Sequence, residues 1–260
     1  KLDHDIQCED YVNLVGKIEI DFQQAISKNL RTRALGNPLK NLKMYAKDYS
    51  RSNRIAEIYT EFLYAPMVDE PVSLEVPFPD LMIFPKVDVR DEAGDFHPFR
   101  RDGKGQSAND LRKNKVPALI LNTTTLNTGH NFQFTASFLG EPLSQRQEND
   151  LDKNLRLRRA YFRDLPIKYQ KLPLGIAVAA SAAVPGLFYP LALTDLYPHI
   201  TPQLVDGGVH DNQGTEGLLD GECTHLIVSD ASGQMGDEHE PDTRTFSVLK
   251  RSSDISTDRI

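Results

Sequence analysis

The stretch Val205–Gly214, which reads VDGGVHDNQG, places a carboxylate and two adjacent glycines behind a short apolar approach. Glycine lets the backbone adopt positive φ and lets another group come close where a Cβ would obstruct it. Both properties are useful where a loop aims a carboxylate, here that of Asp206, into a cleft. The same residue types are also common in tight surface turns, so this stretch alone leaves the two interpretations open.

Apolar runs elsewhere in the chain predict the strands that surround this stretch. Residues 116–122 and 225–229 form nearly continuous apolar runs, which predict strands buried on both faces of a sheet. Residues 131–135 alternate between polar and apolar side chains, which predicts a half-exposed strand. The run at 225–229 leads directly into polar and glycine residues at 230–233, a pattern typical of the site-bearing end of a strand.

Helices are predicted between these strands. Residues 175–183 are almost all small and apolar, which predicts a closely packed helix that the proline and glycine at 185–186 bring to an end. Asn212 is expected to cap a short helix that runs to Leu219. Strands that alternate with helices predict an α/β layer structure with a mainly parallel central sheet. In such a sheet Asp206 is expected at the carboxyl end of a strand, where functional sites form.

Two amphipathic helices are predicted in the first quarter of the chain, because apolar residues recur there at helical spacing. The first spans Tyr11–Leu30, with apolar residues at Val15, Ile18, Phe22, Ala25 and Ile26. The second spans Ser52–Tyr64, with an apolar face made of Ile55, Ile58, Tyr59, Phe62 and Leu63.

The whole chain, 1–260, is interpreted as a single domain that is incomplete at both ends. It begins without a Met and stops inside a segment whose pattern continues. Residues 1–68 are expected to form a helical lead, and residues 69–115, rich in proline, glycine and charge, a loop-rich insertion. Residues 116–260 are expected to supply the sheet and the part that carries Asp206.

The composition is that of a soluble globular protein, with 39% of the 260 residues hydrophobic and 26% charged. The formal net charge of −7 argues against nucleic acid as the main partner, because phosphate binding needs an excess of basic residues. Cys8 and Cys223 are too few for a disulfide framework. Histidines without metal-ligand spacing and the lack of a nucleotide-binding glycine motif predict no metal and no cofactor.

Four motifs carry a resemblance to a known family. In this order and spacing, residues 122–124 (NTT), 127–129 (NTG), 179–188 (AASAAVPGLF) and 205–214 resemble the downstream part of a bacterial patatin-like phospholipase domain. The likeness extends over residues 29–235, and the ordered set is more specific than the Asp-Gly-Gly sequence alone.

The resemblance implies a three-layer α/β/α fold and a serine acyl hydrolase that acts on lipid esters through a Ser-Asp dyad, with no catalytic histidine. On this interpretation Asp206 is the general base, which accepts the serine proton and returns it to the leaving group, and Gly207 and Gly208 support the motif. Because a carboxylate is a weak base for an alcohol, such an enzyme depends on a preorganised oxyanion hole. A lipid ester or phospholipid is the expected partner, and membrane contact is expected only because that substrate resides there.

The sequence departs from the family pattern at the nucleophile. The glycine-rich oxyanion loop and the Gly-x-Ser-x-Gly elbow are both missing, and neither Ser107 nor Ser181 has the strand–turn–helix context that an elbow needs. The nucleophile is therefore expected outside this chain, in residues that precede Lys1. The alternative hypothesis is a catalytically silent domain that binds lipid or a protein partner without turnover.

Overall fold

The computed structural model describes residues 7–27, 49–64, 117–142, 156–221, 223–229 and 236–258. The predicted insertion at 69–115, including Ser107, lies outside these residues. Among the helices that are described, none is long and apolar enough to cross a membrane.

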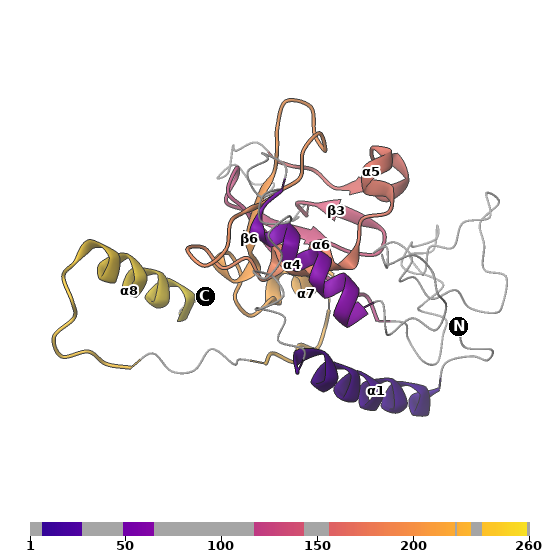
Figure 1. Cartoon of the computed structure of the whole chain (residues 1–260), viewed down its shortest axis with the longest axis horizontal. Helices are drawn as coiled ribbons and strands as arrows, with labels where there is room; N and C mark the ends of the chain where they lie inside the picture. Colours follow the sequence, from indigo (N-terminus) through magenta and orange to yellow (C-terminus); the bar gives the residue numbers. More distant parts are fainter. Residues whose placement is uncertain are drawn as a thin grey trace.

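A single six-stranded sheet, in the order β4-β3-β2-β1-β6-β5, organises the described part of the chain (Figure 1). Every pair of neighbouring strands is antiparallel, and the sheet curls strongly into a half-barrel. The strands are β1 (Leu121–Thr125), β2 (Asn131–Phe134), β3 (Phe138–Gly140), β4 (Ala160–Tyr161), β5 (Leu191–Ala192) and β6 (Gln203–Asp206).

The predicted three-layer fold with a mainly parallel sheet is therefore wrong. The connections at 126–130 and 135–137 join β1 to β2 and β2 to β3, and both are too short for the crossover that parallel neighbours require. The predicted buried strand at 225–229 is also wrong, because these residues are exposed and belong to no strand. Hairpins join β1 to β2, β2 to β3 and β5 to β6, and the pair of β1 and β6, which are remote in sequence, is antiparallel as well.

The first predicted strand is displaced along the sequence. Residues 117–119 of the apolar run at 116–122 are exposed, and β1 begins only at Leu121 and continues through three threonines to Thr125. β-Branched threonine suits a pleated, buried surface, and here all three threonines are buried. The predicted strand at 131–135 is confirmed as β2, although both of its faces are buried.

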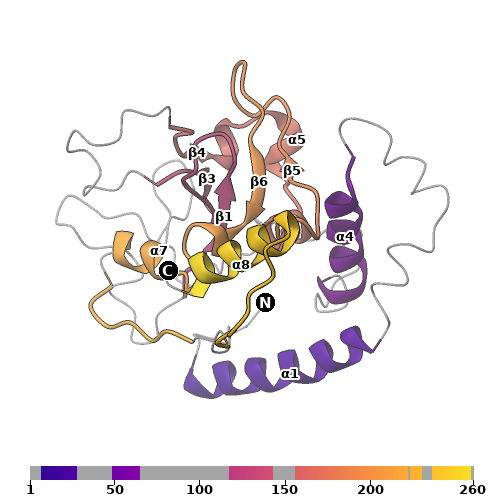
Figure 2. The ribbon, with the colours of Figure 1, turned by 90° about the vertical axis from the view of Figure 1, so that its left-hand side faces the viewer.

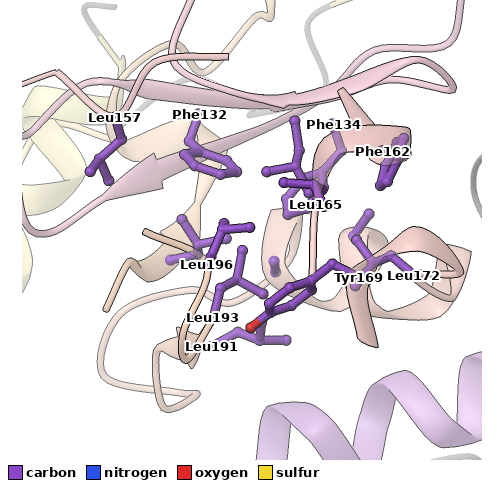
Figure 3. Packing of buried hydrophobic residues seen from close by; sticks show 14 of the residues in the cluster. Phe132, Phe134, Leu157, Phe162, Leu165, Tyr169, Leu172, Leu191, Leu193 and Leu196 are labelled. Atoms are coloured by element: carbon purple, nitrogen blue, oxygen red, sulfur yellow. The ribbon is translucent and has the colours of Figure 1, made fainter. Parts of the chain in front are cut away.

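One face of the sheet carries the main hydrophobic core. Phe132 and Phe134 of β2 lie 5.4 Å apart between ring centroids and are fully buried together with Leu204 of β6. Leucines and aromatic residues from the segments that follow β4 and β5 close around them (Figure 3). The opposite face of β2 carries Asn131 and Gln133, because successive side chains of a strand point to opposite faces. The sheet therefore has an apolar face and a buried polar face.

Helix α6 (Leu174–Ser181), predicted from its small residues, covers the apolar face and packs against helix α4 (Arg51–Tyr59). The π-helix η1 (Thr60–Tyr64) continues α4, which confirms a helix at 52–64. A Cβ on Gly175 of α6 would lie 2.4 Å from the Ala56 carbonyl oxygen, so the two helix backbones are in close contact. Small side chains let them approach this closely.

The buried face of α4 differs from the predicted apolar face. Of the predicted positions, only Ile58 and Leu63 are buried, whereas Ser52, Arg54, Ala56 and Thr60 also face inward. The small residues Ala56 and Thr60 are buried because they meet Gly175 of α6. The partner helix therefore selects which face of α4 is covered.

Three further helices and three short elements complete the described part. Helix α1 (Cys8–Ile26) confirms the first predicted helix as far as residue 26, and helix α8 (Thr245–Asp258) lies away from the sheet (Figure 1). Helix α7 (Thr215–Asp220) and α4 flank β1 and β6 from opposite sides (Figure 2). The short elements are η4 (Phe162–Asp164), α5 (Ile167–Gln170) and η5 (Gly207–Val209).

Candidate functional site

Asp206 is the last residue of β6, as the sequence predicted for a residue at the end of a strand. Its N–H donates to the Ala183 carbonyl at 3.0 Å, just beyond the end of α6, and its carbonyl accepts from the Thr124 hydroxyl at 3.0 Å. Strand pairing sets Asp206 opposite Thr123, which in turn lies opposite Phe132. Since paired residues share a face, the Asp206 side chain leaves the sheet on the side that α6 covers.

The carboxylate of Asp206 is held at one oxygen only. Its Oδ1 accepts the Gly208 N–H at 2.7 Å and thereby caps η5. Within the described part of the chain, Oδ2 has no hydrogen-bond partner. Burial raises the pKa of the Asp206 carboxyl above its usual value, and the Gly208 N–H, which stabilises the charged form, offsets part of this rise. Asp206 is thus a half-buried carboxyl with an oriented side chain and one oxygen that remains able to accept a proton.

The two glycines that follow are required for close approach. A Cβ on Gly207 would lie 2.4 Å from the Asn122 carbonyl oxygen. A Cβ on Gly208 would lie 2.8 Å from Asn212 Oδ1 and 3.0 Å from Asp206 Oδ1. Neither glycine has a positive φ, so of the two properties expected from the sequence, only the absence of a Cβ is used.

The polar residues behind the glycines anchor α7. Asn212 was predicted to cap a short helix, but α7 begins at Thr215 and its N-cap position is Gly214, which has a φ of 67°. The buried carboxylate of Asp211 takes over the expected role, because Oδ2 accepts the Glu216 N–H at 2.7 Å. The predicted helix is therefore present, with the neighbouring residue serving as its anchor.

His210 connects this loop to the turn between β1 and β2. Its Nε2 lies 2.8 Å from Glu216 Oε2, and its Nδ1 lies 3.2 Å from the Gly129 carbonyl oxygen. The hydrogen bond with Glu216 raises the pKa of His210, and the same bond lowers the pKa of Glu216. No sequence spacing could reveal this contact, because Gly129 is remote in the chain.

The polar face of the sheet lies beneath α7. Asn131 donates to Asn122 Oδ1 at 3.3 Å and also hydrogen-bonds with Glu216. A Cβ on Gly217 of α7 would lie 3.0 Å from Gln133 Nε2, so the helix meets this face closely. Among the described residues, the buried atoms Asn131 Oδ1 and Gln133 Nε2 have no hydrogen-bond partner. The loop after β6 and α7 thus cover the polar face of the sheet. A few hydrogen bonds to this face hold the loop and α7 in their orientation.

A buried carboxylate, Glu141, secures the turn that His210 contacts. Its side chain accepts the Leu157 N–H at 3.0 Å and the Thr125 hydroxyl at 3.2 Å, and it also accepts a hydrogen bond from the Thr128 hydroxyl. The residue is 1% exposed. No sequence pattern indicates this role, since Glu141 lies directly after β3 in a stretch of ordinary composition. Hydrogen bonds to the buried Glu141 consequently hold the turn between β1 and β2 in place.

The predicted absence of a nucleophile elbow is compatible with the position of Ser181. This residue is the last of α6 and does not follow a strand. No described serine donates a hydrogen bond to Asp206. The site therefore brings together Asp206, its two glycines and a loop held by His210, and no residue in the described part of the chain hydrogen-bonds to Asp206 Oδ2. Comparison of the chain with protein-family models, with curated protein sequences and with solved structures found no match.

Proposed function

We propose that the protein is a lipid acyl hydrolase of the serine type, in which Asp206 is the general base. The observation that carries this proposal is the state of the Asp206 carboxyl, which is oriented by Gly208 N–H at Oδ1 and unpartnered at Oδ2 within the described residues. A carboxyl whose pKa is raised by burial binds a proton more readily than an ordinary one, which suits a general base.

The resemblance implied a three-layer α/β/α fold, and that fold would have supported the proposal. The observed antiparallel sheet gives no such support. The proposal therefore depends on the local geometry of Asp206 and on the motifs that carry the resemblance. The nucleophilic serine is taken to lie outside this chain. In the reaction, Asp206 Oδ2 accepts the proton of that serine as it attacks the ester carbonyl, and then returns the proton to the leaving alcohol.

Apolar side chains near Asp206 are consistent with a lipid substrate. Ala183, which binds the Asp206 N–H, is followed by Val184, Leu187 and Tyr189, and these three side chains are 40%, 69% and 65% exposed. Exposed apolar side chains that follow a contact of Asp206 in sequence would offer an apolar surface to an acyl chain. An acyl chain would gain about 0.8 kcal/mol for each methylene that it buries against such a surface.

Hydrolysis of a short-chain p-nitrophenyl ester by the complete protein tests the role of Asp206. We expect Asp206→Asn to lower kcat by about 10²- to 10⁴-fold, because the amide retains the hydrogen bond from Gly208 but cannot accept a proton. Asp195→Asn is the matched control, since Asp195 is an exposed aspartate whose pairing with Lys168 contributes little. This control is expected to retain the parental rate.

Two outcomes would count against the proposal. Near-parental turnover by Asp206→Asn would remove Asp206 from the role of base. Binding of phospholipid vesicles by the parent protein, without hydrolysis of any ester offered, would instead support the alternative of a catalytically silent lipid-binding domain.

A further inference from the structure

We propose that His210 is a positioning residue that clamps the Asp206 loop to the β1–β2 turn, and that the clamp requires a proton on both ring nitrogens. The inference concerns the conformation of the loop and rests on the proposed function only where it extends to catalysis. It assigns a task to a histidine that the Ser-Asp mechanism does not use.

The two partners of the ring determine its protonation. The Gly129 carbonyl oxygen, 3.2 Å from Nδ1, can only accept a hydrogen bond, and so can the ionised carboxylate of Glu216, 2.8 Å from Nε2. A neutral imidazole has one N–H and satisfies one of these acceptors, whereas the imidazolium satisfies both. The observed pair of contacts is therefore that of the charged ring.

The ring contacts a turn that is fixed on its other side. The Gly129 N–H donates to the Thr125 carbonyl at 2.9 Å, and Thr125 and Thr128 both donate to the buried Glu141. A hydrogen bond to the Gly129 carbonyl is thus a bond to the rigid end of the β1–β2 hairpin. His210 joins the loop after β6 to that hairpin.

The position of His210 is transmitted to Asp206 through the backbone of η5. The N–H of His210 donates to the Gly207 carbonyl at 3.1 Å, and the N–H of Asp211 donates to the same oxygen at 3.0 Å. The next residue, Gly208, supplies the N–H that holds Asp206 Oδ1. Release of the His210 ring would therefore loosen the turn whose amide orients the carboxylate.

The charged groups around the ring favour the protonated state. Glu216 faces it from α7, Asp211 adds a further negative charge from the same loop, and the Gly129 carbonyl faces it from the β1–β2 turn. On the β2 side, His130 and Asn131 interact with Glu216. Because these groups raise the pKa of His210, the clamp is closed below the ordinary histidine pKa and opens as pH rises through the raised value.

Hydrogen exchange of the Gly208 amide, followed by NMR against pH in the full chain, tests the clamp. After correction for intrinsic exchange, we expect protection in the parent to fall as His210 loses its proton. In His210→Gln, protection should be lower by about tenfold at pH values below the ordinary histidine pKa and should no longer change with histidine titration. In Glu216→Gln, which removes the charge but keeps an acceptor, the loss of protection should move to lower pH.

Controls separate the clamp from general unfolding. The amides of β1 and β2 should retain their protection in both variants, and His239→Gln, the same substitution at an exposed histidine, should behave as the parent. Equal Gly208 protection in the parent and His210→Gln at every pH would overturn the proposal. So would a His210 titration that Glu216→Gln leaves unshifted.

The catalytic extension has its own readout. In the complete protein, the upper limb of the kcat/KM profile for ester hydrolysis should move to lower pH in Glu216→Gln, together with the loss of Gly208 protection. If the parent hydrolyses no ester while the exchange results hold, the proposed function fails and the clamp stands. If hydrolysis is normal and its pH profile is the same in all variants, the catalytic extension fails.

Discussion

At Asp206 the fold keeps a carboxyl where burial disfavours its charge. Because its pKa is raised above the ordinary value, the carboxyl binds its proton more tightly in the native state than in the unfolded chain. The resulting stabilisation is present below the unfolded pKa and is lost as pH rises through the raised native pKa. At neutral pH the charged carboxylate is thus a local cost, as is common for residues that act as bases.

This cost predicts that Asp206→Asn will be more stable than the parent at neutral pH. The amide oxygen still accepts the Gly208 N–H, and the buried charge is gone. We expect a gain of at most about 1 kcal/mol in the free energy of unfolding, since solvent screens a half-buried group. The gain should vanish near pH 3, where the native carboxyl is protonated. Urea denaturation at the two pH values measures it, and a less stable variant at neutral pH would contradict the interpretation.

Residues that act through their immediate neighbours could be found from the sequence. Asp206, Gly207 and Gly208 form one turn. An aspartate followed by two glycines indicates both a carboxylate and a backbone that other groups approach closely. His210 and Glu141 could not be found, because their partners, Gly129 and Leu157, meet them only after the chain has folded. A sequence motif shows a carboxylate and its adjacent glycines more readily than the remote residues that hold their loop in place.

At the scale of elements, the contact between α4 and α6 depends on one glycine. A Cβ on Gly175 would lie 2.3 Å from Thr60 Oγ1 and 2.4 Å from the Ala56 carbonyl oxygen. The second of these atoms belongs to a helix backbone, so it cannot move without displacing the whole of α4. The buried Thr60 hydroxyl, which donates to the Ala56 carbonyl at 2.9 Å, would be displaced as well.

We therefore expect Gly175→Ala to lower the free energy of unfolding by about 1–3 kcal/mol or more, in spite of the higher helix propensity of alanine. Gly16→Ala in α1 is the matched control, because a Cβ there meets nothing within 4 Å. This control should raise helix stability by about 0.5–1 kcal/mol. Thermal and urea denaturation provide the comparison, and equal effects at the two positions would show that α4 and α6 are not in close contact.

The predictions for α4 and α6 show which features of a helix its own residue pattern determines. The small residues of α6 predicted both the helix and its close packing, and both were confirmed. The apolar residues of α4 predicted a helix, yet its buried face includes Ser52 and Thr60, because α6 presents glycine and alanine to it. The covered face of a helix depends on the shape of its partner, and that information lies elsewhere in the chain.

At the scale of the whole molecule, the direction of the strands was the principal error. The prediction of a parallel sheet required buried apolar runs at 116–122 and 225–229, but much of the first run and all of the second lie at the surface. The observed strands bury polar side chains instead, because the buried residues of β1 are threonines and β2 buries Asn131 and Gln133 beside its two phenylalanines. Alternation identified β2, but it could not show that the polar face of β2 is covered by a loop and a short helix.

The run at 225–229 gives the sharpest test of this arrangement. Ile227 is 95% exposed, although its neighbours in sequence are those of a buried strand. We expect Ile227→Ser to change the free energy of unfolding by less than about 0.5 kcal/mol, as is usual for a surface position. Leu204→Ala in β6 is the contrasting variant, because Leu204 is 0% exposed and its truncation should cost about 2–5 kcal/mol. If Ile227→Ser instead costs as much as Leu204→Ala, residues 225–229 are buried in solution, and the sheet must contain a further strand.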